Sequence, residues 1–205
     1  NVEITCDNRK IVPPVVSMKG VFELPYYFSY INVSVTSFAA DLHPIGMYEL
    51  TGKTGAFFKN SYIDASGVWT EAEVKNLFAQ LSLEITLQER AALFDDFLQT
   101  KAPSVLSEKS LLVERADAMA KDHQYQCSVK LIASELSVSE KMLTRAFKKV
   151  LGVTPKQYFT SALFEEIVRR YAIDQKSSIT DFLESPFYDF SHINKWFKKY
   201  TQVAP

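Results

Sequence analysis

A short basic element occurs twice in this chain, fifty residues apart. The first copy reads SEKMLTRAFKKVLGVTP over residues 139–155, and the second reads DFSHINKWFKKYTQVAP over residues 189–205. Both copies place a phenylalanine before two lysines, and both end in proline at the same offset. A repeated element of this kind predicts two similar structural units. The repeat therefore restricts the second half of the chain to folds with two matching helical modules.

The first copy has the periodicity of an amphipathic helix over residues 139–151. Leu143, Phe147 and Val150 lie at positions i, i+4 and i+7, which share one face of a helix. We expect this face to be buried in a core. The opposite arc then carries a ridge of polar and basic side chains, namely Lys141, Thr144, Arg145 and Lys148. Lys149 adds a further positive charge next to this ridge.

The second copy predicts a similar helix over residues 189–200. Ile193 and Phe197 are expected to face inward. The outward arc then contains Ser191, Asn194, Lys195 and Lys198. His192 is expected to act as a cap or a phosphate contact rather than as a metal ligand, because the three histidines lack the spacing of a metal site.

Capping residues divide the rest of this half into further helices. We expect helices over residues 108–122, from residue 128 to the turn before Ser139, over 155–171 and over 179–184. Gly152 suits a helix C-cap, and Thr154 with Pro155 suits a helix start. The expected inward stripe of the helix over residues 108–122 is Leu111, Leu112, Ala116 and Met119. That of the helix from residue 128 is Leu131, Ile132, Ala133 and Leu136. That of the helix over residues 155–171 is Tyr158, Phe159, Leu163 and Ile167.

Two helices joined by a tight turn, the second basic on its outer face, form a helix-turn-helix. The second helix of such a unit enters the major groove of double-stranded DNA. Two units, from residues 129–151 and 179–200, would read successive major grooves about 34 Å apart. The helix over residues 155–171 spans about 25 Å, which with its flanking turns is the right order for that separation.

These two units resemble those of AraC/XylS-type bacterial transcription regulators. LIASELSVSEKMLTRAFKKVLGVTPKQYF resembles the first unit and ITDFLESPFYDFSHINKWFKKYTQVAP the second, so the resemblance covers about residues 108–205. Ser137 stands where such proteins usually have a turn glycine, and the second copy is about one residue short before Pro186. The resemblance implies a sequence-specific DNA-binding transcription regulator that can also contact RNA polymerase. The alternative is a degenerate AraC-like protein-interaction module with weak or no specific DNA binding.

Residues 1–65 have the pattern of strands and turns. INVSVTSF over residues 31–38 alternates as a half-buried antiparallel strand does, whereas HPIG and TGKTG are rich in turn residues. The aromatic cluster LPYYFSYI suits either core packing or the wall of a ligand pocket. VSVTSFAADLHPIGMYELTG is similar to the sensor region of one branch of the same regulators, a cupin-like β-barrel followed by helices. That similarity implies a partial barrel that binds a small-molecule effector or forms a homodimer.

Two capping boxes mark the helices that follow. Thr70 stands three residues before Glu73, and Thr86 stands three before Glu89, so we expect helices over residues 70–81 and 86–99. Their apolar stripes, which suit a core or a dimer surface, are Val74, Leu77, Phe78 and Leu81, and then Leu93, Phe94, Phe97 and Leu98. Pro103 ends this region, and Ser107 suits a new N-cap. We therefore expect an α+β sensor or dimerisation region over residues 1–103 and an all-α double helix-turn-helix domain over 104–205.

Composition agrees with a cytoplasmic regulator that has no membrane partner. The chain is 47% hydrophobic, enough for a core, but no apolar run approaches the roughly 18 residues of a membrane helix. Residues 1–104 carry eight basic and twelve acidic side chains, whereas residues 105–205 carry fifteen and twelve. The two cysteines lie far apart, and no catalytic, phosphate-loop or metal motif occurs, so we expect no enzyme and no cofactor. Because the chain starts without Met, we also expect the native ends to lie beyond it.

Overall fold

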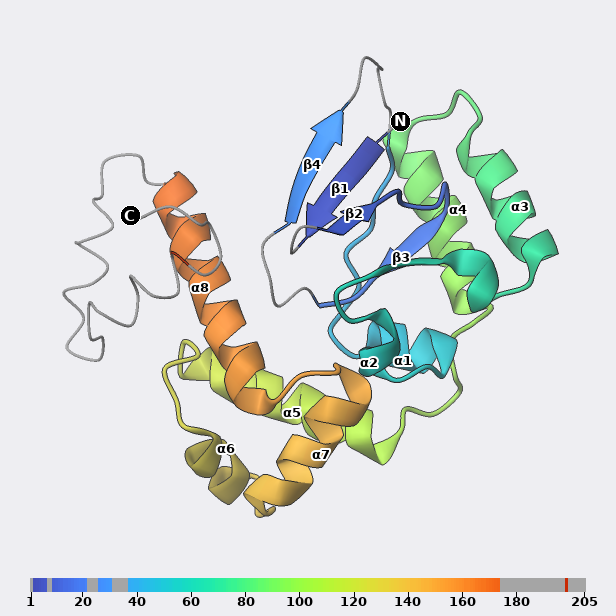
Figure 1. Cartoon of the computed structure of the whole chain (residues 1–205). Helices are drawn as coiled ribbons and strands as arrows, with labels where there is room; N and C mark the ends of the chain where they lie inside the picture. Colours follow the sequence, from blue (N-terminus) through green and yellow to red (C-terminus); the bar gives the residue numbers. More distant parts are fainter. Residues whose placement is uncertain (1, 7–8, 22–25, 31–36, 174–197, 199–205) are drawn as a thin grey trace. The chain divides into compact units, whose positions relative to one another are not determined.

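The computed structural model describes residues 2–6, 9–21, 26–30, 37–173 and 198 (Figure 1). These residues form two units. The first comprises residues 1–111 together with 148–152, and the second comprises 112–147 and 153–205. The structure is rich in helices and has two small antiparallel sheets, so the predicted α+β class is confirmed at that level. The cupin-like barrel and the boundary at residue 103 stay predictions.

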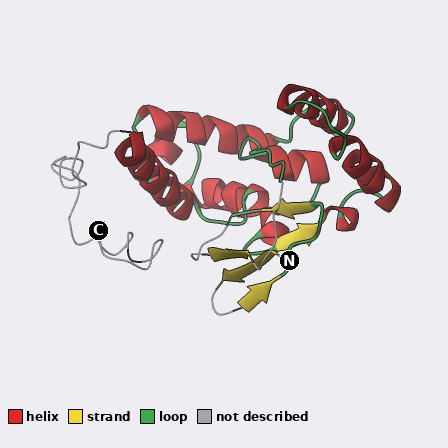
Figure 2. Cartoon of the chain, turned by 90° about the horizontal axis from the view of Figure 1, so that it is seen from above, coloured by secondary structure: helices red, strands yellow, loops and turns green. Residues whose placement is uncertain are grey.

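All the described strands belong to the first unit, where Figure 2 shows them in yellow. The central strand β1 (Val2–Cys6) pairs antiparallel with β2 (Arg9–Ile11) on one side and β4 (Tyr26–Tyr30) on the other. A separate pair joins β3 (Ser17–Lys19) to β5 (Tyr62–Asp64). The strand predicted over residues 31–38 lies outside the described residues up to Thr36, and Ser37 and Phe38 are not in a strand. The side chains of the aromatic cluster over residues 24–31 also lie outside the described ones.

Two short helices occupy the segment whose sequence predicts only turns. They are α1 (Gly46–Thr51) and α2 (Gly55–Phe58). Gly52 ends α1 with a left-handed φ of 66°, which a glycine adopts without the steric cost that a Cβ would bring. The prediction of strands and turns alone over residues 1–65 is therefore wrong here, because the glycines of the turn-rich segments also bound short helices.

The two capping boxes form as predicted. Helix α3 (Glu71–Leu81) starts at Thr70, whose hydroxyl accepts from the backbone N–H of Glu73 while the Glu73 carboxylate accepts from Thr70. Helix α4 (Leu87–Gln99) repeats the arrangement with Thr86 and Glu89. Residues far apart in the sequence form the core beneath these helices: Met18, Phe58, Ala65 and Val74, with Trp69 packed against them.

The predicted stripes of these two helices are only partly buried. Val74 and Leu77 of α3 are buried, but Phe78 is 46% exposed, so of the two predicted roles Phe78 does not take the core one. The four apolar side chains of α4 are half-buried. Trp69 holds α4 through an edge-to-face contact with Phe97, whose ring centroid lies 4.8 Å away.

Helices α5 (Glu108–Asp122), α6 (Val129–Glu135), α7 (Glu140–Val150) and α8 (Pro155–Ile173) follow the predicted order. Helices α5 and α7 each contribute residues to both units. The buried residues of α5 are Ser110, Val113, Ala116 and Ala120, so Ala116 of the predicted stripe is confirmed. The prediction for Leu111 is wrong, because it is 42% exposed, and Leu112 and Met119 are half-buried. On α6, Ile132, Ala133 and Leu136 are buried as predicted, but Leu131 is 40% exposed.

Candidate nucleic-acid interface

Helices α6 and α7 are joined by a tight turn, as the helix-turn-helix prediction requires (Figure 1). Ser128 caps α6 by accepting from the backbone N–H of Leu131 at 3.1 Å. Ser139 caps α7 by accepting from the backbone N–H of Met142 at 3.2 Å. These serine hydroxyls satisfy backbone donors that have no partner within a first helical turn. The sequence thus determines where both helices begin.

The turn itself depends on a left-handed residue. Ser137 has a φ of 57°, and its backbone N–H donates to the carbonyl of Ser134. The next residue, Val138, donates back to the carbonyl of Ala133 at 2.9 Å. These two bonds close the C-terminus of α6 and direct the chain into α7. The backbone conformation is the one that a glycine adopts most readily, and a serine holds it here.

The inward face of α7 is fully packed. Leu143 and Phe147 are both 0% exposed, and Ala146 and Val150 are 2% exposed. The ring of Phe147 meets Tyr158 and Phe159 of α8 edge to face, at centroid distances of 5.6 and 5.7 Å. The predicted buried face of α7 is confirmed.

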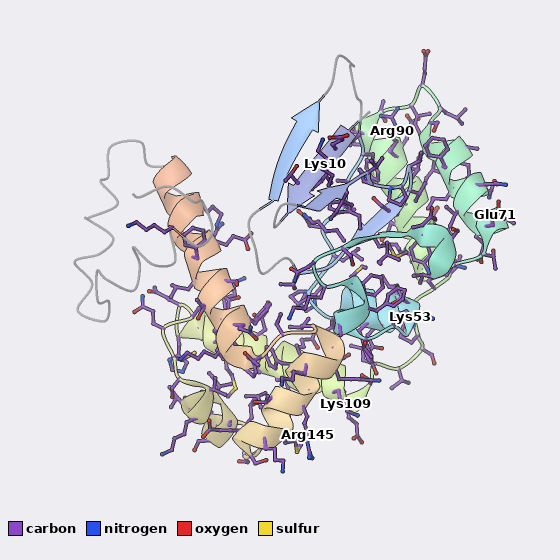
Figure 3. The ribbon with its side chains drawn as sticks, viewed as in Figure 1. Lys10, Lys53, Glu71, Arg90, Lys109 and Arg145 are labelled. Carbon is purple, nitrogen blue, oxygen red and sulfur yellow. The ribbon has the colours of Figure 1, made fainter. Side chains whose placement is uncertain are left out.

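The outward face of α7 carries the predicted ridge. Lys141, Arg145 and Lys148 are exposed, and Thr144 is half-buried between them and the core. Figure 3 labels Arg145, whose side chain extends away from the helix. Within the described part of the chain, the three basic side chains have no hydrogen-bond or ion-pair partner. Their charges are therefore available to a polyanion such as DNA.

Lys149 occupies a different position from the other basic residues of α7. It lies about 100° around the helix from Lys148, because an α-helix has 3.6 residues per turn. Its ammonium nitrogen is 5.9 Å from the centroid of the Tyr48 ring, within the same unit. This geometry is that of a cation–π contact. The structure thus brings Lys141, Arg145 and Lys148 onto one face and places Lys149 beside it.

The second reading unit lies largely outside the described residues. Ser191, His192, Asn194 and Lys195 belong to that part of the chain. Lys198 is described and is exposed. The predicted contacts of this unit remain predictions.

Two side-chain contacts lie among the helices around α7. The Tyr125 hydroxyl donates to the Asp117 carboxylate at 3.0 Å, and His123 Nε2 lies 3.3 Å from Glu135. Burial, and then the Asp117 charge, raise the pKa of both Tyr125 and Tyr158 above the usual value of a tyrosine, so both hydroxyls stay protonated. The His123–Glu135 contact joins the segment that follows α5 to α6.

Two exposed lysines were not predicted as contacts. Lys130 lies in the first turn of α6, and Lys156 lies in the first turn of α8. Their charges add to the positive surface of the helix-turn-helix. The signal in the sequence is a lysine two residues after a capping position, which lies outside the repeated ridge.

A family model described as a helix-turn-helix domain matches residues 132–205. No match was found among curated proteins or among solved structures. None of the helices in the described ranges is both long and apolar enough to cross a membrane. The matched domain is a DNA-binding regulatory domain rather than a catalytic one. The match and the α6–turn–α7 geometry therefore support a DNA-binding transcription regulator with an AraC-like helix-turn-helix in its second half.

Proposed function

We propose that this protein regulates transcription by binding specific DNA sequences through helix α7. The observation that carries the proposal is the division of α7 into two faces. One face is fully buried around Leu143 and Phe147, and the opposite face presents three exposed cations that have no ion-pair partner among the described residues. A helix held rigidly from behind, with basic side chains in front, suits the major groove, which is about 12 Å wide.

The residues of the ridge have different expected partners. Arg145 carries a planar guanidinium that pairs with both acceptors on a guanine edge, and it lies at the middle of α7. Lys141 and Thr144 flank it on the same arc. Lys148 lies one turn further on, near the end of the helix, where a phosphate is the expected partner. The ridge thus combines sequence reading with attachment to the backbone of the duplex.

We further propose that the second copy reads the next major groove. Helix α8 has 19 residues, which corresponds to a length of about 28 Å at 1.5 Å per residue. This length suits a connector between two grooves about 34 Å apart. The proposed contacts of the second copy are Ser191, His192, Asn194, Lys195 and Lys198. Residues 104–205 would then carry both helix-turn-helix units.

Residues 1–103 are proposed to control this binding, through a small-molecule effector or a homodimer. Exposed apolar side chains on and between α3 and α4 support a surface of this kind: Phe78, Leu83 and Leu87. Contact with RNA polymerase and a location in the cytoplasm would follow from a role in bacterial transcription.

Selection from a random duplex library, with the protein at moderate salt, tests the proposal. A regulator enriches one sequence motif, and its affinity for that motif falls steeply as salt rises, because each phosphate contact releases counterions. The alternative, a degenerate protein-interaction module, enriches no motif. Recovery of a motif by the parent, and its loss in the triple variant Lys141→Ala, Arg145→Ala, Lys148→Ala, would support α7 as the reading element. Failure to enrich any motif would contradict the proposal.

A further inference from the structure

Residues 46–58, which form α1 and α2, contact two segments that lie far away in the sequence. These segments are the first turn of α5 and the last turn of α7. All of these residues belong to the first unit, which includes residues 148–152. The three contacts of the 46–58 segment involve Glu49, Gly55 and Tyr48.

Glu49 of α1 holds the start of α5. Its carboxylate accepts from the Ser107 hydroxyl at 2.8 Å and from the Ser107 backbone N–H at 3.3 Å. It also accepts from the hydroxyl of Ser110, a side chain that is fully buried. A carboxylate at this end of a helix is further stabilised by the unpaired N–H groups of the first turn. Glu49 therefore fixes α5 to α1.

Gly55 of α2 fits against the end of α7 because neither residue of the contact has a side chain. A Cβ built on Gly55 would lie 2.0 Å from the carbonyl carbon of Leu151. A Cβ built on Gly152 would lie 2.5 Å from the carbonyl carbon of Gly55. Gly152 also has a φ of 78°, which favours glycine. Backbone meets backbone at this point, so the contact tolerates no larger residue on either side.

Tyr48 directly precedes Glu49 in the sequence and faces Lys149. The 5.9 Å distance from the Lys149 ammonium to the ring places this cation over α1. Lys148, the ridge residue that belongs to the same unit, is exposed. The 46–58 segment therefore contacts the last turn of α7 at Lys149 and leaves Lys148 exposed.

We infer that the 46–58 segment positions the reading helix, with Tyr48 and Gly55 as positioning residues. Tyr48 acts on Lys149 of α7, and Gly55 acts on the backbone of Leu151 and Gly152 at the end of α7. This inference rests on the proposed DNA binding through α7. The end of α7 held by Gly55 fixes the angle at which the ridge is presented. Lys149 is assigned to this contact and not to a phosphate. A change that moves α1 and α2 would then alter DNA affinity although the residues that contact DNA are unchanged.

Hydrogen exchange on the full chain without DNA tests the positioning contact by itself. The change Gly55→Ala forces a Cβ into the backbone of Leu151, so the amides of residues 149–152 should exchange about tenfold faster. Gly67→Ala is the matched control, because the nearest atom to its added Cβ is a side-chain carbon 3.9 Å away. Unchanged exchange at residues 149–152 in Gly55→Ala would overturn the inference, whether or not the protein binds DNA.

DNA affinity as a function of salt tests the assignment of Lys149 with variants that leave the backbone contact intact. Tyr48→Leu and Lys149→Met should each weaken binding roughly two- to fivefold, the range of an exposed cation–π contact. The double variant should bind DNA no more weakly than either single variant. The salt slope of all three variants should equal that of the parent. Lys148→Met, the neighbouring lysine on the ridge, should instead lower the slope by about one. The assignment would be overturned if Lys149→Met lowered the salt slope by about one while Tyr48→Leu kept the DNA affinity of the parent.

Discussion

Phe147 of α7 meets Phe159 of α8 edge to face, with their ring centroids 5.7 Å apart and their planes at 83°. Phe147 is fully buried and Phe159 is 3% exposed. This pair attaches the proposed reading helix to the helix that follows it. The orientation of the basic ridge thus depends on an apolar contact on the opposite side of α7.

Replacing Phe147 with alanine should remove this attachment. Loss of a buried phenylalanine typically costs about 3–5 kcal/mol of unfolding free energy, because apolar contacts are lost and a cavity remains. Chemical denaturation monitored by circular dichroism measures the change. Met142→Ala is the control on the same helix, since Met142 is 51% exposed and should cost little. Equal effects of the two substitutions would contradict the assigned faces of α7.

Replacing Ser137 with glycine should stabilise the turn between α6 and α7. A non-glycine residue at positive φ costs roughly 1–2 kcal/mol, and glycine removes this cost while adding some entropy to the unfolded chain. We expect a net gain of up to about 1 kcal/mol for Ser137→Gly. Ser137→Val should lose stability, because a β-branched side chain fits this region poorly. A loss in Ser137→Gly would show that the serine side chain contributes more than its backbone conformation costs.

Replacing Glu73 with glutamine should weaken the first turn of α3 only where the carboxylate is charged. The hydrogen bond from Lys101, followed by those from Thr70, lowers the pKa of Glu73 from 4.5 to about 2. A lowered folded-state pKa gives stability that is complete above pH 4.5 and is lost as the pH falls towards 2. Glu73→Gln should therefore melt below the parent at neutral pH, with the difference closing towards pH 2. A difference that is constant across this range would exclude the charged contact as its source.

Local capping chemistry makes the helices of this protein predictable. The Thr70–Glu73, Thr86–Glu89 and Ser139 caps all form the expected hydrogen bonds. Such caps involve residues three apart, so the information needed to recognise them lies within one turn of sequence. The bounds of α3, α4, α5 and α7 consequently agree with the predicted bounds to within one or two residues.

Which face of a helix is buried is harder to predict when a residue far away in the sequence determines it. Ser110 is buried because its hydroxyl donates a hydrogen bond to the Glu49 carboxylate and accepts one from the Ser107 hydroxyl. That polar contact turns Leu111 outward, although leucine is the more apolar residue. Helices α1 and α2, with six and four residues, are too short to show periodicity. Their positions depend on contacts about sixty and one hundred residues away, which no local pattern records.

Replacing Lys148 with alanine should weaken binding to every DNA sequence by a similar factor. A lysine at the end of the ridge contributes a phosphate contact, which carries no sequence information. The slope of log affinity against log salt should fall by about one. Titrations of the selected motif and of a scrambled duplex at two salt concentrations measure both effects. A loss confined to the selected motif would make Lys148 a base contact.

The central claim, that α7 reads base sequence through its exposed ridge, is tested most directly by Arg145→Ala. The measurement is the affinity of parent and variant for the selected operator and for operators with one changed base pair. The account predicts that the variant loses about 1–3 kcal/mol on the selected operator and no longer distinguishes one particular base pair. An equal loss on all operators, with discrimination at every base pair retained, would contradict the claim and make Arg145 a phosphate contact.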